Sequence, residues 1–244
     1  MKKSLLAWSA VAAFGSLVSG SALAQNAGDW VLGTGWLHFA PQDSSKPLTF
    51  TSPINAVVPG SGSGVGSSDT LGLSAVYFID SRWAVEGVFG VPPKFELQGE
   101  GSLAPIGKLG EAKQWSPTFL AKYYFGNGND AFRPFAGLGA TYVWYSDTEL
   151  TPGLQNALGG RLGRPPGSTT TSAKLDKSFA PVFNIGAAYQ FDKHWGVSFS
   201  VSYIPLKTTA KLTTRNAAGT TIGTSEARLK LDPIVTYLSA TYRF

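Results

Sequence analysis

The sequence predicts an all-β protein, an eight-stranded antiparallel transmembrane β-barrel with long extracellular loops and short periplasmic turns. Segments with strand-like alternation of apolar and polar residues recur along the chain. Charged residues make up 14% of the chain, whereas about 25% is usual for soluble proteins. After residue 24 no apolar run approaches the roughly 20 residues that a spanning helix needs. Strands must therefore cross the membrane, and their sheet must close because an open edge leaves backbone groups unpaired in lipid.

The first 24 residues are expected to be a signal peptide that is removed on export. Lys2 and Lys3 precede an apolar stretch over residues 5–18, and an Ala-Leu-Ala cleavage site follows at 22–24. We therefore predict a signal peptide over 1–24 and a barrel over 25–244, located in the outer membrane of a Gram-negative cell. The chain has no cysteine, which excludes disulfides and thiolate metal sites. No cofactor is expected.

Eight strand segments are expected, and the connections between them alternate in length. Short turns at 80–81, 126–131 and 192–194 alternate with long connections rich in Gly, Ser, Thr and Pro. This asymmetry is typical of outer-membrane barrels, whose short turns lie in the periplasm. The expected strands are Asp29–Pro41, Asp69–Ile79, Arg82–Gln98, Lys113–Phe125, Phe132–Tyr145, Lys174–Phe191, Trp195–Leu212 and Ala227–Phe244. The expected loops are Gln42–Ser68, Gly99–Ala112, Asp147–Ala173 and Thr213–Glu226.

The last strand shows how side chains should face. Counting every second residue, Ile234, Leu238 and Phe244 share one face, which we expect to contact lipid, and Val235 and Arg243 share the other. The same parity gives apolar outward faces with aromatic residues near the strand ends, as in lipid-facing bands. These outward residues include Trp83, Val85, Phe89, Val91, Phe119, Tyr123, Tyr142, Trp144, Phe183, Ile185, Tyr189, Trp195, Phe199 and Tyr203.

Several stretches of the chain point to one known family. They are Gly28-Asp29-Trp30, Trp83-Ala84-Val85-Glu86, Pro117 to Phe125, Arg133 to Gly139, Tyr203-Ile204-Pro205, Leu231-Asp232-Pro233 and the terminal Tyr242-Arg243-Phe244. Together they resemble the outer membrane protein W (OmpW) family, including its alkane-uptake branch, AlkL, over nearly the whole mature chain. The resemblance implies an eight-stranded barrel that passes small hydrophobic molecules through the outer membrane. The end signal for the barrel-assembly machinery usually has Gly where this chain has Ser239.

Eight strands enclose a lumen that side chains can fill, which excludes a wide aqueous pore. Inward parity places charged and polar residues near the periplasmic turns, where they should pair as a plug, and apolar residues above them. The expected periplasmic plug is Glu86, Lys122, Arg133, Gln190 and Arg243. The expected lining of the substrate channel is Leu37, Phe39, Val76, Val88, Leu120, Val143, Phe179, Ile204 and Val235. Phe179 has outward parity and is included on the expectation that a bulge at Pro181 turns it inward.

Six prolines stand at a similar distance from the periplasmic end of their strands. Proline cannot donate to a strand ladder, so a ring of prolines interrupts the bonding at one level. Together with the resemblance, this favours a lateral opening through which an apolar solute passes from the lumen into the bilayer. The alternative is that the prolines only bend the strands outward. The six are Pro41, Pro92, Pro117, Pro181, Pro205 and Pro233.

These observations predict passive uptake of small hydrophobic molecules across the outer membrane, through an apolar upper lumen and with lateral release into the bilayer. The expected partners are outer-membrane lipid and lipopolysaccharide, small hydrophobic solutes and, through the C-terminal strand, the barrel-assembly machinery. A monomer is expected because a closed barrel needs no partner subunit. Nucleic acid is not expected, because the basic residues are scattered.

Three other functions stay open on the sequence alone. The first is an ion or polar-solute channel, and the second is an adhesive or structural barrel that works through its long loops. The third is a lipid-modifying outer-membrane enzyme, which needs a base near a nucleophile. Only His38, with Ser44 and Ser45 in the following loop, and His194 offer that chemistry, so no enzyme is expected.

Overall fold

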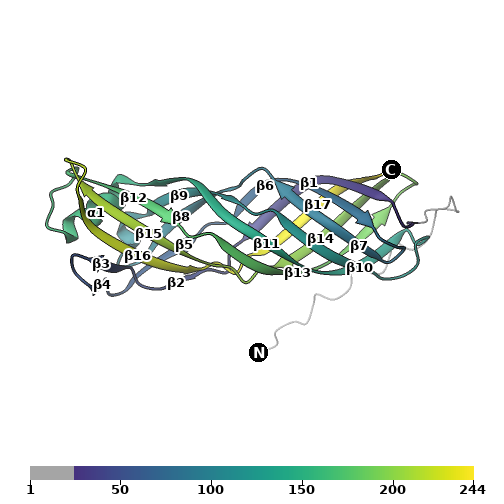
Figure 1. The fold of residues 1–244 in the computed structure, drawn as a ribbon, viewed down its shortest axis with the longest axis horizontal. Coiled ribbons are helices and arrows are strands. Elements are labelled where there is room, and N and C mark those ends of the chain that lie inside the picture. The colour runs from purple at the N-terminus through teal and green to yellow at the C-terminus, as the bar shows by residue number, and fades with distance from the viewer. Residues whose placement is uncertain (1–24) are drawn as a thin grey trace, which may run out of the picture.

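The computed structural model describes residues 25–244, and the signal peptide predicted over 1–24 lies outside the described residues. Eight strands form a closed antiparallel barrel (Figure 1), which confirms the predicted fold class. Around the barrel the order is β1, β6, β7, β10, β11, β13, β14, β17 and back to β1. Their bounds are β1 Trp30–Ala40, β6 Ser68–Phe78, β7 Trp83–Gly90, β10 Thr118–Tyr124, β11 Phe132–Leu150, β13 Ser178–Gln190, β14 Trp195–Tyr203 and β17 Ile234–Arg243.

Short turns join these strands at one end, which also holds the C-terminus (marked C in Figure 1). We call this the short-turn end and the opposite one the long-loop end. No helix in the described part of the chain is long and apolar enough to cross a membrane.

The outside of the eight strands is apolar, as the parity predicts. Phe119 is 62% exposed, Leu138 58% and Ile185 66%, whereas a soluble protein seldom leaves a contiguous apolar surface of this kind in water. Aromatic pairs lie near the short-turn end, where the ring centroids of Trp30 and Tyr77 are 5.0 Å apart. Such a girdle is typical of the membrane interface. The outward faces therefore form a lipid-facing band.

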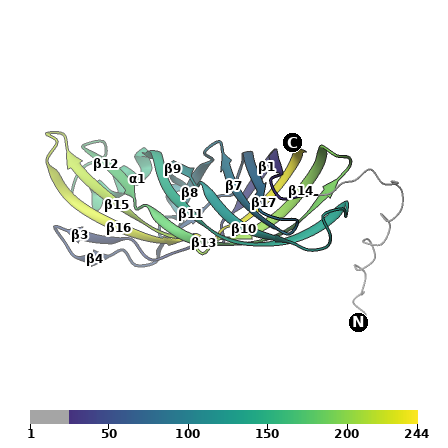
Figure 2. The same ribbon diagram turned by 45° about the vertical axis from the view of Figure 1, so that its right-hand side comes forward.

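Beyond this band the chain builds a second layer of structure, which we call the upper tier (Figure 2). The regions predicted as loops are largely strands, because neighbouring segments pair and bury residues such as Leu48, Phe50 and Leu109. The upper-tier elements are β2 Ser44–Ser45, β3 Thr49–Ser52, β4 Ala56–Val57, β5 Ser61–Val65, β8 Lys94–Gly101, the 3-10 helix η1 Ala104–Ile106, β9 Lys108–Trp115, β12 Thr169–Leu175, β15 Lys207–Asn216, β16 Thr221–Lys230 and α1 Pro152–Arg161. β11 runs through both tiers.

Five of the predicted strands are each broken in two at the junction of the tiers. Arg82–Gln98 forms β7 and β8, and Lys113–Phe125 forms β9 and β10. Proline stands in these breaks, at Pro92, Pro93 and Pro117, because it has no N–H to give to a ladder. The other three are Lys174–Phe191 (β12 and β13), Trp195–Leu212 (β14 and β15) and Ala227–Phe244 (β16 and β17).

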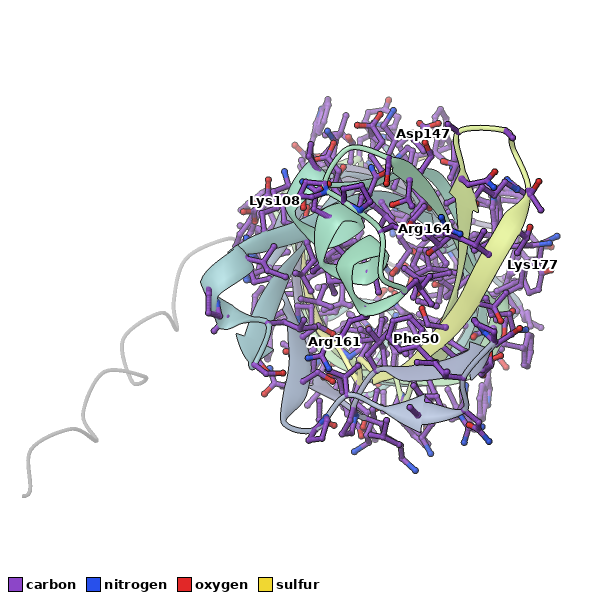
Figure 3. The ribbon with its side chains drawn as sticks, turned by 90° about the vertical axis from the view of Figure 1, so that its left-hand side faces the viewer. Phe50, Lys108, Asp147, Arg161, Arg164 and Lys177 are labelled. Carbon is purple, nitrogen blue, oxygen red and sulfur yellow. The ribbon has the colours of Figure 1, made fainter. Side chains whose placement is uncertain are left out.

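Helix α1 was not predicted from the sequence, although its start carries clear signals. Thr151 caps it by accepting a hydrogen bond from the backbone N–H of Leu154, and Pro152 follows at the first helical position. Leu154 and Leu158, one helical turn apart, are buried. In Figure 3, viewed from the long-loop end, α1 lies across the mouth of the barrel. A solute that enters along the barrel axis therefore meets the helix first.

The tight packing of neighbouring strands predicts which glycines tolerate a methyl group. A Cβ on Gly139 of β11 would lie 1.9 Å from the carbonyl oxygen of Phe119, whereas one on Gly160 of α1 meets nothing within 4 Å. We expect Gly139→Ala to lower the free energy of unfolding by about 1–3 kcal/mol. Gly160→Ala is the matched control and should leave it unchanged or raise it by up to about 1 kcal/mol. Denaturant unfolding in lipid vesicles measures both, and equal effects would contradict the packing.

Candidate functional site

A buried ion pair fills the lumen towards the short-turn end. The antiparallel register of β7 and β10 sets Glu86 opposite Leu120 and beside Lys122, and the Lys122 Nζ lies 2.5 Å from the Glu86 Oε2. Both side chains are almost fully buried. The Lys122 Nζ also lies 4.0 Å from the centroid of the Phe135 ring, a cation–π arrangement. Glu86 and Lys122, both predicted as plug residues, therefore form an ion pair.

The two predicted plug arginines bind groups at the short-turn end instead of this pair. Arg133 donates from Nη1 to the Gln25 side-chain oxygen and from Nη2 to the Ser81 carbonyl at 2.6 Å. Arg243 donates from Nε to the Lys193 carbonyl at 2.9 Å. The prediction that all the charges pair with one another was therefore wrong. Arg243 Nη1 also lies 3.9 Å from the Asp29 Oδ2, so groups at the end of the barrel hold both arginines.

Little free space remains in this part of the lumen. Gln190 lines a cavity of about 20 Å³ together with Glu86, Lys122 and Tyr124. A space of that size holds about one water molecule. The lumen between the ion pair and the short-turn end is therefore packed with side chains, and no solute larger than water fits there without rearrangement.

Above the ion pair the lumen opens into two apolar cavities. The lower one, which we call the lateral cavity, has a volume of about 290 Å³. It is lined by predicted channel residues, namely Leu37, Phe39, Val88, Leu120, Ile204 and Val235. Its floor includes Glu86, Asn184 and Ser200. Val143 is buried in the same apolar cluster without lining this cavity.

The second cavity, the upper cavity, lies in the upper tier. Its volume is about 110 Å³, and leucines of α1, β8, β9 and β15 line it. Phe39 and Gln114 line both cavities. These two side chains thus form the partition between them.

Two predicted channel residues lie elsewhere. Phe179 is 75% exposed and faces outward. β13 keeps an unbroken register past Pro181, which pairs with Ala140, so no bulge turns the ring inward. Val76 pairs with Glu86 across β6 and β7 and is buried in the cluster near the short-turn end. It therefore lies at the level of the ion pair and below the apolar cavities.

One side of the lateral cavity opens through the barrel wall, and we call this opening the lateral gap. β7 and β10 pair up to Val88 and Thr118, and the next backbone bond runs from the Gln114 N–H to the Pro93 carbonyl at 3.0 Å. Within the described structure, no backbone hydrogen bond joins residues 89–92 to residues 115–117. The lipid-facing residues Phe89, Val91 and Trp115 line this cavity together with the lumen residues.

Only two of the six predicted prolines, Pro92 and Pro117, stand in the two segments that border this gap. At Pro41, at Pro233 and on the β17 side of Pro205, backbone hydrogen bonds carry the ladder across, including Ile204 N–H to Pro233 carbonyl at 3.1 Å. At Pro181, and between β13 and Pro205, the wall is filled by Ala180, Val182 and Leu206, each 1% exposed. The prediction that all six prolines belong to the lateral opening was therefore wrong for these four, because neighbouring backbone or side chains occupy the space.

An ion-pair network joins β8 and β9 directly above the gap. Lys108 binds Glu96 at 2.6 Å and Glu111 at 2.7 Å, and Lys94 also binds Glu111. The hydrogen bonds from Lys108 and then Lys94 lower the pKa of Glu111 to about 2. The carboxylate therefore keeps its charge, and its hold on both lysines, over the whole neutral range.

Both histidines have structural partners. The His38 Nδ1 lies 2.7 Å from an oxygen of Asp69, which also accepts from Trp36 Nε1 at 2.8 Å. Ser45, one of the nearby serines considered as a nucleophile, accepts a hydrogen bond from Ser63 N–H. The His194 Nδ1 lies 2.9 Å from the Arg243 carbonyl oxygen. The surroundings of His38 are typical of the membrane interface, and those of His194 are typical of a turn.

The family assignment rests on a match over nearly the whole sequence. The pattern of the OmpW family matches residues 26–244. The chain belongs to the OmpW family. It is therefore an outer-membrane barrel of the Gram-negative type and not an enzyme, as the sequence predicts.

Individual relatives agree with this assignment over nearly their full length. Outer membrane protein W of Vibrio cholerae is 28% identical over 96% of this chain and 97% of its own. Outer membrane protein AlkL of Ectopseudomonas oleovorans is 26% identical over 90% of this chain and 84% of its own. The crystal structure of the outer membrane protein OprG from Pseudomonas aeruginosa matches with a TM-score of 0.77 and 27% identity, over 92% of this chain and 99% of that one.

The buried pair predicts opposite outcomes for single and double substitutions. Glu86→Ala leaves the Lys122 ammonium buried without a counter-charge, and we expect a loss of about 3–5 kcal/mol in the free energy of unfolding. Glu86→Leu combined with Lys122→Met removes both charges and should recover most of that loss. Unfolding in lipid vesicles measures both variants. A double variant as unstable as the single one would refute the pairing.

The network above the gap predicts a defined pH dependence. Because the folded-state pKa of Glu111 is lowered from 4.5 to about 2, its contribution is fully present above 4.5 and disappears as the pH falls through 2. Glu111→Gln should therefore lower the melting temperature slightly at neutral pH, since exposed pairs are weak. The difference from the unsubstituted protein should vanish near pH 2. A difference that persists there would contradict the assignment to this carboxylate.

Proposed function

We propose that the protein carries small hydrophobic molecules passively across the outer membrane. The solute enters the apolar space from the long-loop end, which faces the outside, and reaches the lateral cavity. It then leaves through the lateral gap into the bilayer. The observation that carries this proposal is one cavity lined both by lumen residues, such as Leu37 and Leu120, and by the lipid-facing Phe89 and Val91.

The filled lower lumen supports a sideways exit over a straight one. Below the lateral cavity a solute meets the Glu86–Lys122 pair, whose separation would leave charges buried without a partner. The side of the cavity offers apolar residues and then lipid, so an apolar solute stays in apolar surroundings along the exit. The same geometry disfavours an ion channel, because a hydrated ion has no polar path through the packed end.

Cavity size indicates the class of solute. An apolar cavity of about 150 Å³ is large enough to bind benzene, and the lateral cavity measures about 290 Å³. Solutes with one or two aromatic rings, or alkanes of comparable volume, fit this space. The resemblance to the alkane-uptake branch of the family supports the same class.

The outer wall also suits contact with lipopolysaccharide, which we propose as a partner. Lys46, Lys207, Arg228 and Lys230 line one groove outside β15 and β16, at the base of the upper tier. Phosphates of the outer leaflet are natural counter-ions for such a cluster. We further propose a monomer whose C-terminal strand is read by the barrel-assembly machinery.

Uptake by intact cells tests the function. Cells that lack their own OmpW-family protein would express this chain, and the entry rates of octane, naphthalene and a sugar of similar volume would be compared with those of cells carrying an empty vector. We expect faster entry of the two hydrocarbons and no change for the sugar. Faster entry of the sugar, or steady ion conductance of the purified protein in planar bilayers, would favour a polar channel and refute the proposal.

The lateral exit predicts that two prolines behave differently. Pro92→Thr supplies an N–H in a segment that borders the gap, which favours closure of the ladder, and hydrocarbon entry should fall severalfold. Pro205→Thr is the matched control, because side chains already fill the wall beside it, and entry should stay unchanged. Heat-dependent mobility on gels verifies that both variants fold. Equal entry rates in the two folded variants would count against exit at this gap.

A further inference from the structure

A second opening leads into the apolar space from the side, in the upper tier. β12 forms a strand ladder with β15 only, while the upper part of β11 pairs with β9. Within the described structure, no backbone hydrogen bond joins β11 to β12 above the pair Val143 and Ser178. The two strands thus leave a seam, which we call the upper seam.

The upper seam is a real groove and not only a missing ladder. Residues 144–148 of β11 and residues 173–177, from the end of β12 onwards, line a space of about 660 Å³. Four of these residues, Tyr145, Thr148, Ala173 and Leu175, also line the upper cavity. The groove and the cavity therefore share a wall, and a molecule in the groove lies against the apolar interior.

The two ends of the upper seam are closed by defined contacts. At the top, Gln155 of α1 bridges the strands, because its side-chain oxygen accepts from Thr171 N–H at 3.1 Å and its Nε2 donates to the Leu150 carbonyl at 3.0 Å. At the bottom, β11 and β13 pair again. The opening therefore has fixed limits between these two points.

The axial route at the same end is obstructed. α1 lies across the mouth (Figure 3), and its Leu154 and Leu158 belong to the same buried cluster as Phe50 and Leu109. A solute that moves along the axis must displace this cluster. A solute that enters by the seam passes between two strand edges that are not bonded to each other.

The upper seam is polar at its rim and apolar behind it. Its rim carries Asp147, Lys174, Asp176 and Lys177, of which Asp147 is paired with Lys113 at 2.9 Å and Asp176 with Lys211 at 2.9 Å. Asp147 and Lys177 lie on the same side of the mouth in Figure 3. Behind the rim stand Tyr145, Ala173 and Leu175. Such a groove, with a polar rim and an apolar wall behind it, suits a flat or thin apolar molecule.

We infer that the upper seam between β11 and β12 is the port through which small apolar solutes enter the upper cavity. This inference rests on the proposed function and adds its entrance. The solute passes the rim, lies against Ala173 and Leu175, and descends past Phe39 and Gln114 to the lateral cavity. Helix α1 then acts as a fixed cover and need not open.

The absence of cysteine allows a clean test of the entrance. Ala173→Cys introduces a thiol in the wall that the groove and the cavity share. The control, Ser172→Cys, places a thiol on the preceding residue, whose side chain faces outward and is exposed. Intact cells carrying either variant are treated with a bulky methanethiosulfonate reagent. Naphthalene entry is measured before treatment, after it and after release of the label with a reductant.

We expect labelled Ala173→Cys to lose naphthalene entry severalfold and to regain it after reduction, while labelled Ser172→Cys keeps its rate. Mass spectrometry verifies complete labelling. Full labelling with unchanged entry in Ala173→Cys overturns the port, and so does an equal loss in Ser172→Cys. If neither unlabelled variant nor the unsubstituted protein admits naphthalene faster than empty-vector cells, the proposed function fails instead. The label is attached after folding, so misfolding cannot imitate a block.

Discussion

The structure depends on one constraint, which is that no backbone N–H or C=O can remain unpaired in hydrocarbon. Eight strands satisfy it by closing on one another, from the pairing of β1 with β17 to the pairing of β10 with β11. Every departure from the ladder lies towards the long-loop end, where the strands break and the upper tier begins. Residues 89–92 and 115–117 face each other unbonded at that level. The wall is thus continuous over the lower barrel and interrupted near the outer edge of the lipid-facing band.

The packing of the lumen follows from the number of strands. Eight strands leave room for side chains and little else, so the distribution of those side chains decides what can pass. Near the short-turn end they are tightly packed, and Glu86 and Lys122 satisfy each other in the interior beside an apolar cluster. Further up, Leu37, Leu120 and Val235 leave free volume. On the proposed route, the boundary between these two environments directs a solute sideways.

Parity and turn lengths were enough to predict the barrel, its lipid-facing residues and the contact of Glu86 with Lys122, because each of these depends on period-two alternation and on neighbouring strands. The failures have two causes. Phe179 was placed inward against its parity, and the parity was right because β13 keeps its register past Pro181. The level of Val76 and the position of the gap depend on register and on local filling, which alternation does not encode. The two arginines bind turn carbonyls, which strand parity does not predict. Helix α1 was not predicted because a ten-residue helix that contains Gly153, Gly159 and Gly160 has a low helix propensity.

The division into two tiers at the level of the strand breaks has a further consequence. A membrane-spanning section must match the thickness of the hydrocarbon, since mismatch costs free energy for each ångström. Here the lipid-facing band lies on the eight strands below the breaks, and among the described strands only β11 runs on through the level of the breaks. We expect segments of the upper tier, such as β15 and β16, to lengthen, shorten or change sequence with little effect on membrane insertion. The long-loop end and the bilayer anchorage can then diverge independently within one polypeptide.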